Sequence, residues 1–158
     1  MTLDFTLNGK PVLLECTADT RLTDILREHL ARTATKLACG IGRCGACSVL
    51  INGRLANACL LMAFQLEGAD IMTVEGLLAH PLGQAVREGL AEENAFQCGY
   101  CAPGVSLALV ALFAEQPDAG EREIRAGLEG NLCRCTGYHS IIRGALNAAS
   151  RIRTAQLR

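Results

Sequence analysis

Apolar and polar residues alternate in the first part of the chain, and this period of two predicts short β-strands. Residues 2–7 and residues 12–16 both alternate in this way. Between them lies Asn8-Gly9, a pair that strongly favours a two-residue hairpin turn. Residues 48–51 and 71–74 are further short segments rich in apolar residues. Asn52-Gly53, directly after the first of them, predicts a second hairpin turn. The pattern therefore predicts a small β-sheet in the N-terminal half.

Helical spacing dominates the chain beyond these strands. One earlier helix is predicted within residues 20–30, after Asp19 and Thr20, either of which can cap a helix N-terminus. Residues 76–83 include Pro81 and predict a linker. Beyond it, the helical period recurs in residues 82–90, 103–113, 124–128 and 141–149.

The order of these elements predicts the fold class. Strand, hairpin, strand, helix, loop and further strands is the order of a β-grasp. We therefore predict an α+β protein, with an N-terminal β-grasp domain over residues 1–76. A small four-helix-bundle domain is predicted over residues 77–158. A chain of 158 residues is long enough for two small domains.

Composition argues against several classes of function. The net charge is −1 and no basic stripe is present, which argues against nucleic-acid binding. No apolar run approaches the roughly 18 residues of a membrane span, and the N-terminus has no targeting pattern. We therefore expect a cytoplasmic protein that binds neither nucleic acid nor membrane. In that reducing compartment, nine cysteines indicate metal ligands rather than disulfides.

Eight of the nine cysteines fall into two groups of four. The first group, spaced C-x4-C-x2-C-x11-C, is Cys39, Cys44, Cys47 and Cys59. The second group, spaced C-x2-C-x31-C-x-C, is Cys98, Cys101, Cys133 and Cys135. Four thiolates is the ligand count of one iron–sulfur cluster, so the sequence predicts two such clusters.

The first group has the ligand spacing of plant-type ferredoxins, which bind a 2Fe-2S cluster. Gly40, Gly42 and Gly45 lie among its cysteines and allow backbone N–H groups to approach the sulfur atoms closely. A structural zinc site is the alternative. Zinc sites usually show two compact C-x2-C pairs, which this spacing does not match.

The second group lies at predicted helix boundaries. Cys98 and Cys101 precede a helix with Pro103 at its first position, and Cys133 and Cys135 lie between two helices. Helix N-termini are partially positive, so placing both pairs at helix starts would stabilise thiolates. The alternative, a thioredoxin-like C-x2-C motif, needs a βαβ context that this half lacks.

The remaining candidate residues predict no catalytic site. Cys16 shares a strand face with apolar residues, so it is expected in the core. His29 is expected near a helix C-terminus, His80 in the linker, and His139 after the last cysteine motif. None of them lies in a catalytic pattern, and we predict that the isolated chain catalyses nothing.

Three motifs resemble the iron–sulfur subunit of the molybdenum hydroxylases, the family of xanthine oxidase and aldehyde oxidoreductase. They occupy residues 39–47 (CGIGRCGAC), 97–104 (QCGYCAPG) and 130–138 (GNLCRCTGY). The resemblance implies an electron-transfer subunit of an oxidoreductase. Its two 2Fe-2S clusters would relay electrons from a molybdopterin site in a large subunit to FAD in a medium subunit.

The resemblance also implies roles for individual residues. The first cysteine group would hold the cluster nearer FAD, and the second the cluster nearer molybdenum. Gln97 would touch the molybdopterin, often the cytosine dinucleotide in this family, and Cys135 would be the ligand nearest the pterin amino group. The backbone around Gly42, Arg43 and Gly45 is expected to face the flavin subunit. The three subunits would form a heterotrimer or its dimer.

Two alternative functions stay open. One is a free-standing two-cluster ferredoxin, although such a carrier usually has a strongly charged docking face and the net charge here is −1. The other is a zinc-stabilised interaction module. The substrate of the complex and its final electron acceptor are not encoded in this chain.

Overall fold

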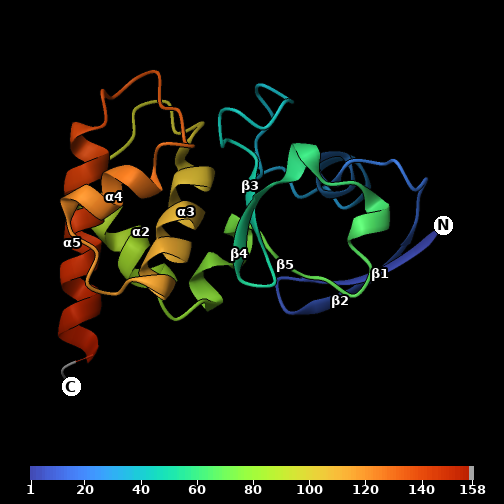
Figure 1. The fold of residues 1–158 in the computed structure, drawn as a ribbon, viewed down its shortest axis with the longest axis horizontal. Helices are drawn as coiled ribbons and strands as arrows, with labels where there is room; N and C mark the ends of the chain where they lie inside the picture. The colour runs from blue at the N-terminus through green and yellow to red at the C-terminus, as the bar shows by residue number, and fades with distance from the viewer. Residues whose placement is uncertain (157–158) are drawn as a thin grey trace.

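The computed structural model describes residues 1–156, which form a β-sheet with short helices and a group of longer helices beside it (Figure 1). The strands are β1 (Thr2–Leu7), β2 (Lys10–Glu15), β3 (Ser48–Ile51), β4 (Arg54–Asn57) and β5 (Asp70–Met72). The α-helices are α1 (Leu22–Asp24), α2 (Gly83–Glu92), α3 (Ala102–Glu115), α4 (Glu121–Gly127) and α5 (His139–Gln156). The short helices of other types are η1 (Ile25–His29), η2 (Ala58–Leu60), η3 (Ala63–Gln65) and η4 (Val74–Ala79).

Within the described residues the sheet has five strands in the order β2-β1-β5-β3-β4. Only β1 and β5 pair in parallel, and the other neighbours are antiparallel. Asn8-Gly9 and Asn52-Gly53 form the two hairpin turns, each with both residues at positive φ. This is the conformation in which Asn-Gly pairs suit the twist of a hairpin, so both turn predictions are confirmed.

The first helix begins differently from the prediction. Its N-cap is Arg21, and neither Asp19 nor Thr20 caps it. Leu22 N–H instead donates to Leu61 O at 2.8 Å, so a distant backbone carbonyl satisfies the helix start. After one turn the segment continues as the π-helix η1, with His29 in its last turn.

Two boundaries also differ in the second half of the chain. The predicted linker, residues 76–83, is not an extended connection, because η4 occupies much of it and buries Leu77. The strand before it ends at Met72, so Val74 belongs to η4. Pro103 is the second residue of α3 rather than the first.

Buried side chains within residues 1–155 form two apolar clusters. One lies between the sheet and the α1–η1 segment, with Leu3, Phe5 and Leu26 among its members. The other lies among α2, α3, α4 and α5 and also includes Leu50 of β3. The α+β class, with a β-grasp followed by a bundle of helices, is thereby confirmed. The boundary at residue 76 stays a prediction.

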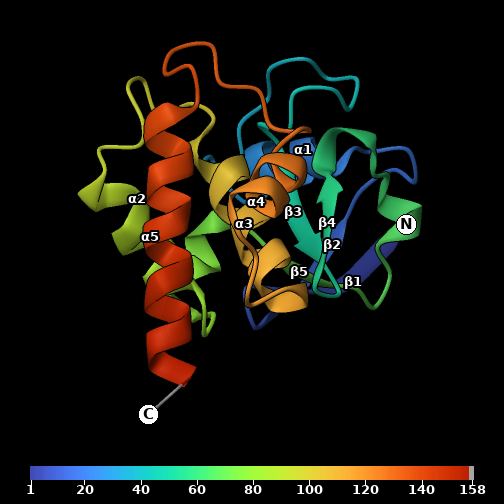
Figure 2. The same ribbon diagram turned by 60° about the vertical axis from the view of Figure 1, so that its left-hand side comes forward.

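Helices α2 and α5 pack with their backbones in contact, and α5 runs along the outer side of the group (Figure 2). A Cβ at Gly89 of α2 would lie 2.5 Å from Ala148 N of α5. Glycine is therefore required at this crossing. No helix within the described residues is long and apolar enough to span a membrane.

Candidate metal sites

Three members of the first cysteine group, Cys39, Cys44 and Cys47, lie in the loop that joins η1 to β3. Gly40, Gly42 and Gly45 all have positive φ, as the sequence predicted for a loop that wraps closely around sulfur. The backbone N–H groups of Ile41 and Arg43 point at Cys39 Sγ, at 3.5 and 3.3 Å. Because these donors stabilise the thiolate, they lower the pKa of Cys39 to about 6.

The other end of this group is buried. Cys47 and Cys59 are 2% and 1% exposed. Cys47 directly precedes β3 and Cys59 follows β4, so the β3–β4 hairpin brings them together although they are distant in sequence. Burial and the neighbouring Cys59 thiol raise the pKa of Cys47 to about 11. The group thus combines an outer thiol, Cys39, that ionises readily with an inner thiol, Cys47, that resists ionisation.

The second cysteine group comes from two segments of the helical half, one before α3 and one between α4 and α5. Cys101 is the N-cap of α3, and Cys98 precedes it by one turn. Cys133 and Cys135 lie in the segment before α5, which begins at His139. The prediction that this pair lies at a helix start is therefore wrong. The Cys135 thiol donates to Cys98 Sγ at 3.5 Å. Burial and the adjacent Cys133 thiol raise the pKa of Cys101 to about 12.

The eight thiols lie in four pairs, and the two members of each pair belong to the same group. The pairs are Cys39 with Cys44, Cys47 with Cys59, Cys98 with Cys135, and Cys101 with Cys133. Within the described residues, no three potential ligands surround one point as they would for a single metal ion. Two irons with two cysteines each are the ligand demand of a 2Fe-2S cluster. The paired thiols therefore fit that group.

The environment of Thr35 also fits a cofactor bound beside the first cysteine group. It is buried, and within the described residues its hydroxyl has no hydrogen-bond partner. The next residue, Lys36, donates its N–H to Ala46 O at 3.3 Å, which places Thr35 beside the loop end that contains Cys47. A buried hydroxyl without a partner is costly in a chain that binds nothing. No pattern in the sequence pointed to this residue.

The two cysteine loops contact each other directly. Leu132 N–H donates to Cys44 O at 2.9 Å, and Asn131 Nδ2 donates to Gly45 O at 3.2 Å. The Tyr100 hydroxyl donates to Leu37 O at 2.7 Å. These contacts correct one expectation: Gly45 is buried against the helical half and cannot face another subunit.

Gln97 and Cys135 meet at the outer edge of the second group. Gln97 Nε2 donates to Cys135 O at 3.1 Å, and both residues are exposed. The sequence linked this pair only through the family resemblance, and the structure brings the two residues together. Their contact with a pterin stays a prediction.

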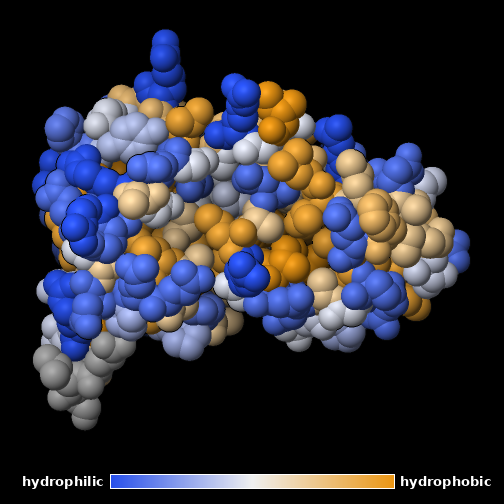
Figure 3. Space-filling model, viewed as in Figure 1, coloured by the Kyte–Doolittle hydropathy of each residue, from blue (hydrophilic) through white to orange (hydrophobic). Residues whose placement is uncertain are grey.

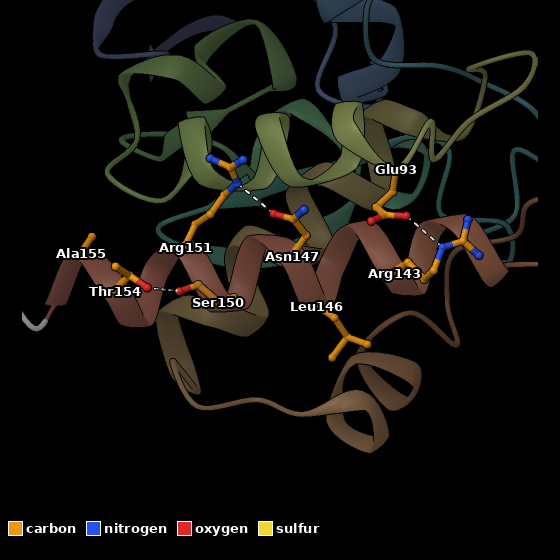
Figure 4. A pocket seen from close by; sticks show the side chains of 8 residues that line it. All are labelled: Glu93, Arg143, Leu146, Asn147, Ser150, Arg151, Thr154 and Ala155. Atoms are coloured by element: carbon orange, nitrogen blue, oxygen red, sulfur yellow. Dashed lines mark hydrogen bonds and ion pairs between the residues drawn. The ribbon is translucent and has the colours of Figure 1, made fainter.

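The remaining candidates lie away from these loops. Cys16 is half-buried at the end of β2, so its predicted place in the core is only partly correct. The cleft of about 790 Å³ along α5 is lined by polar side chains, among them Arg143, Asn147 and Arg151, and by the apolar Leu146 and Ala155 (Figure 4). Its Arg143–Glu93 ion pair, at 2.9 Å, links α5 to the end of α2. Its lining contains no cysteine, and we assign it a structural role.

Comparison with known families matches both halves of the chain. Residues 5–73 match the family described as "2Fe-2S iron-sulfur cluster binding domain". Residues 73–146 match the family described as "[2Fe-2S] binding domain". Each half therefore corresponds to one of the two cysteine groups.

Whole-chain relatives extend these matches. The chain is 39% identical over 149 residues to the xanthine dehydrogenase iron-sulfur-binding subunit of Escherichia coli O157:H7, covering 93% of this chain and 93% of that protein. Quinoline 2-oxidoreductase from Pseudomonas putida 86 matches with a TM-score of 0.90 and 38% identity, over 98% of this chain and 96% of that chain. Aldehyde oxidoreductase from Desulfovibrio gigas matches with a TM-score of 0.87 and 32% identity, over 98% of this chain but 17% of that chain.

Proposed function

This chain belongs to the iron–sulfur subunits of the xanthine dehydrogenase and aldehyde oxidoreductase family of oxidoreductases, and we propose that it relays electrons inside a molybdenum hydroxylase. The electrons would come from a molybdopterin site in a large subunit and leave to FAD in a medium subunit. The predicted family is confirmed, and the relay between these two cofactors is the proposed part. The two 2Fe-2S clusters of this chain would each take up and release one electron.

The observation that supports a relay best is the placement of the two groups. Each group has an accessible outer edge, with Cys39 at one and Cys98 and Cys135 at the other. Between these edges, the Cys44 carbonyl meets the Leu132 N–H directly. Two sites in contact with each other, and each open to a partner, are what passage of electrons across a small subunit requires.

Cys39, Cys44, Cys47 and Cys59 would hold the cluster nearer FAD. The surface beside it is apolar: Ile41 is 63% exposed and Leu60 is 53% exposed, and Leu60 contacts Gly42. Figure 3 shows hydrophobic residues gathered across the middle of this face, between the two halves, and a smaller group at the top among hydrophilic residues. An apolar surface of this kind suits a permanent interface, and we assign it to the medium subunit, with Gly42 and Arg43 facing the flavin.

Cys98, Cys101, Cys133 and Cys135 would hold the cluster nearer molybdenum. Gln97 and Cys135 would lie against the molybdopterin, here assigned as the cytosine dinucleotide by family resemblance. The exposed side chains of Tyr100 and Leu132 flank this region. The Gln97–Cys135 hydrogen bond would fix the amide for contact with the pterin.

The assembly and its location follow from the same assignment. We assign the chain to a cytoplasmic heterotrimer, or a dimer of that heterotrimer. The two domains of this chain would meet near residue 76, where η4 follows the last strand of the sheet. The last two residues of the predicted helical domain, 157–158, lie outside the described residues.

Iron analysis and partner capture test this function. The chain, purified anaerobically with its partners, should contain about four iron and about four labile sulfide, the content of two 2Fe-2S clusters. It should co-purify with a molybdopterin-binding and an FAD-binding subunit. A colourless zinc protein would refute the cluster assignment, and an iron-loaded chain without partners would favour the free-standing ferredoxin. Substrate turnover by the isolated chain would contradict its role as a relay.

A further inference from the structure

Asn131 connects the two cysteine sites through both its side chain and its backbone. Its side-chain Nδ2 donates to Gly45 O at 3.2 Å. Its backbone carbonyl accepts from the Tyr138 hydroxyl at 3.1 Å, and that hydroxyl accepts from Cys133 N–H at 2.9 Å. Hydrogen bonds therefore run from the loop of the first site, through Asn131, to a cysteine of the second.

The contact made by this amide is buried and crowded. Asn131 is 3% exposed, so its polar side chain needs a partner within the protein. A Cβ at Gly45 would lie 2.6 Å from Asn131 Nδ2 and 2.4 Å from Gly130 O. The two loops thus touch at van der Waals distance, and their relative position is fixed at this point.

The backbone hydrogen bond between Leu132 and Cys44 also depends on Asn131. Leu132 follows Asn131 and donates its N–H to Cys44 O, but Leu132 itself is exposed. Water can therefore compete with this hydrogen bond unless the turn is fixed from the buried side. The Asn131 amide is the group that anchors the turn there.

We propose that Asn131 is the positioning residue that fixes the second cluster site against the first. The separation and relative orientation of the two clusters would then depend on its amide, although it binds neither of them. This inference rests on the proposed function where it concerns clusters. Its structural part, the tie between the two loops, concerns the protein alone.

Two substitutions at this position test the role of the amide. Asn131→Ala removes both the donor and the bulk of the side chain. Asn131→Asp keeps the shape but replaces the donor with a carboxylate oxygen, so the hydrogen bond to Gly45 O becomes a repulsion between two acceptors. Asn57→Ala is the matched control, because Asn57 Nδ2 donates to Gly42 O at 3.1 Å in the same loop without reaching the helical half.

The variants are compared with wild type in the intact complex by two measurements. Hydrogen exchange at the Leu132 amide should become about tenfold faster in both Asn131 variants, the effect of losing one hydrogen bond of ordinary strength. It should not change in Asn57→Ala. Electron paramagnetic resonance of the fully reduced complex should show a weaker or more heterogeneous magnetic interaction between the two clusters in the Asn131 variants only.

Wild-type exchange and wild-type magnetic interaction in Asn131→Ala would overturn the proposal, and so would wild-type behaviour of Asn131→Asp. If Asn131→Ala does not fold, Tyr138→Phe decides, because it removes only the hydroxyl that links Asn131 O to Cys133 N–H. Cys133 exchange should then accelerate, and unchanged exchange would overturn the proposal. The exchange result holds with or without iron, whereas a complex lacking about four iron per chain would refute the proposed clusters separately.

Discussion

Replacing Gly104 by alanine should separate the two cysteine loops. Gly104 is in the first turn of α3, where a Cβ would lie 2.0 Å from Gly45 O. An ordinary C···O contact is about 3.3 Å, so the helix start and the loop must move apart by more than about 1 Å. The obstacle is a backbone carbonyl, which cannot rotate away as a side chain can. Cys101, the N-cap of this helix, would move with it.

The expected change in stability is opposite in sign to that of most helical glycines. A glycine replaced by alanine inside a helix usually gains about 0.5–1 kcal/mol. Overpacking against an immobile group costs about 1–3 kcal/mol, and the upper part of that range applies here. The net result is a loss of about 1–2 kcal/mol in the free energy of unfolding.

Urea unfolding of the purified chain measures this loss as a lower midpoint with an unchanged slope. Gly127→Ala is the matched control, because a Cβ there would meet only the Leu112 side chain, at 3.1 Å. That side chain is flexible, so this variant should be neutral or slightly stabilised. If Gly104→Ala were as stable as Gly127→Ala, the close contact between α3 and the Gly45 loop would not exist in solution.

Three further predictions follow from the cysteine sites. In the cluster-free chain, the rate of alkylation of Cys39 by iodoacetamide should be high at pH 7 and level off above it, because the pKa of Cys39 is about 6. The rate for Cys101 should keep rising with pH up to its pKa of about 12. Equal rates for the two thiols by mass spectrometry would contradict this. Thr35→Val should stabilise the cluster-free chain by about 1–3 kcal/mol, because it removes an unpaired buried hydroxyl. In the loaded protein the same change should lower the reduction potential of the first cluster in a redox titration, and an unchanged potential would show that the hydroxyl does not serve the cluster. Cys44→Ser should remove the first paramagnetic signal and Cys133→Ser the second, each with only mild broadening of the other, whereas loss of both signals in a folded variant would refute the grouping of ligands.

Local patterns were sufficient to predict much of this fold. Asn8-Gly9 and Asn52-Gly53 specify their turns within two residues, because only a few residue types accept positive φ at both positions. The alternation in residues 2–7 and the apolar periodicity of α2, α3 and α5 likewise depend on near neighbours. Spacing alone also divided the eight clustered cysteines into the groups that the structure brings together.

The errors and omissions concern contacts between distant segments. The start of α1 depends on Leu61 O, and the path of residues 74–79 depends on burial of Leu77 among the helices. Asn131 stood inside a recognised motif, yet its role depends on a loop 86 residues earlier. Thr35 could have been noticed only as a polar residue just before the cysteines, a weak signal without the fold.

The dependence of the Gly45 loop on Asn131 also sets an order for biosynthesis. All four cysteines of the first group leave the ribosome early, but the residue that closes over their loop follows 86 positions later. At about 5–20 residues per second, this delay is roughly 4–17 s. During that time the loop lacks its buried contact, so the first site has all four cysteines before its position against the second site is fixed. A cluster inserted during this interval would therefore enter a loop whose position relative to the helical half is not yet set.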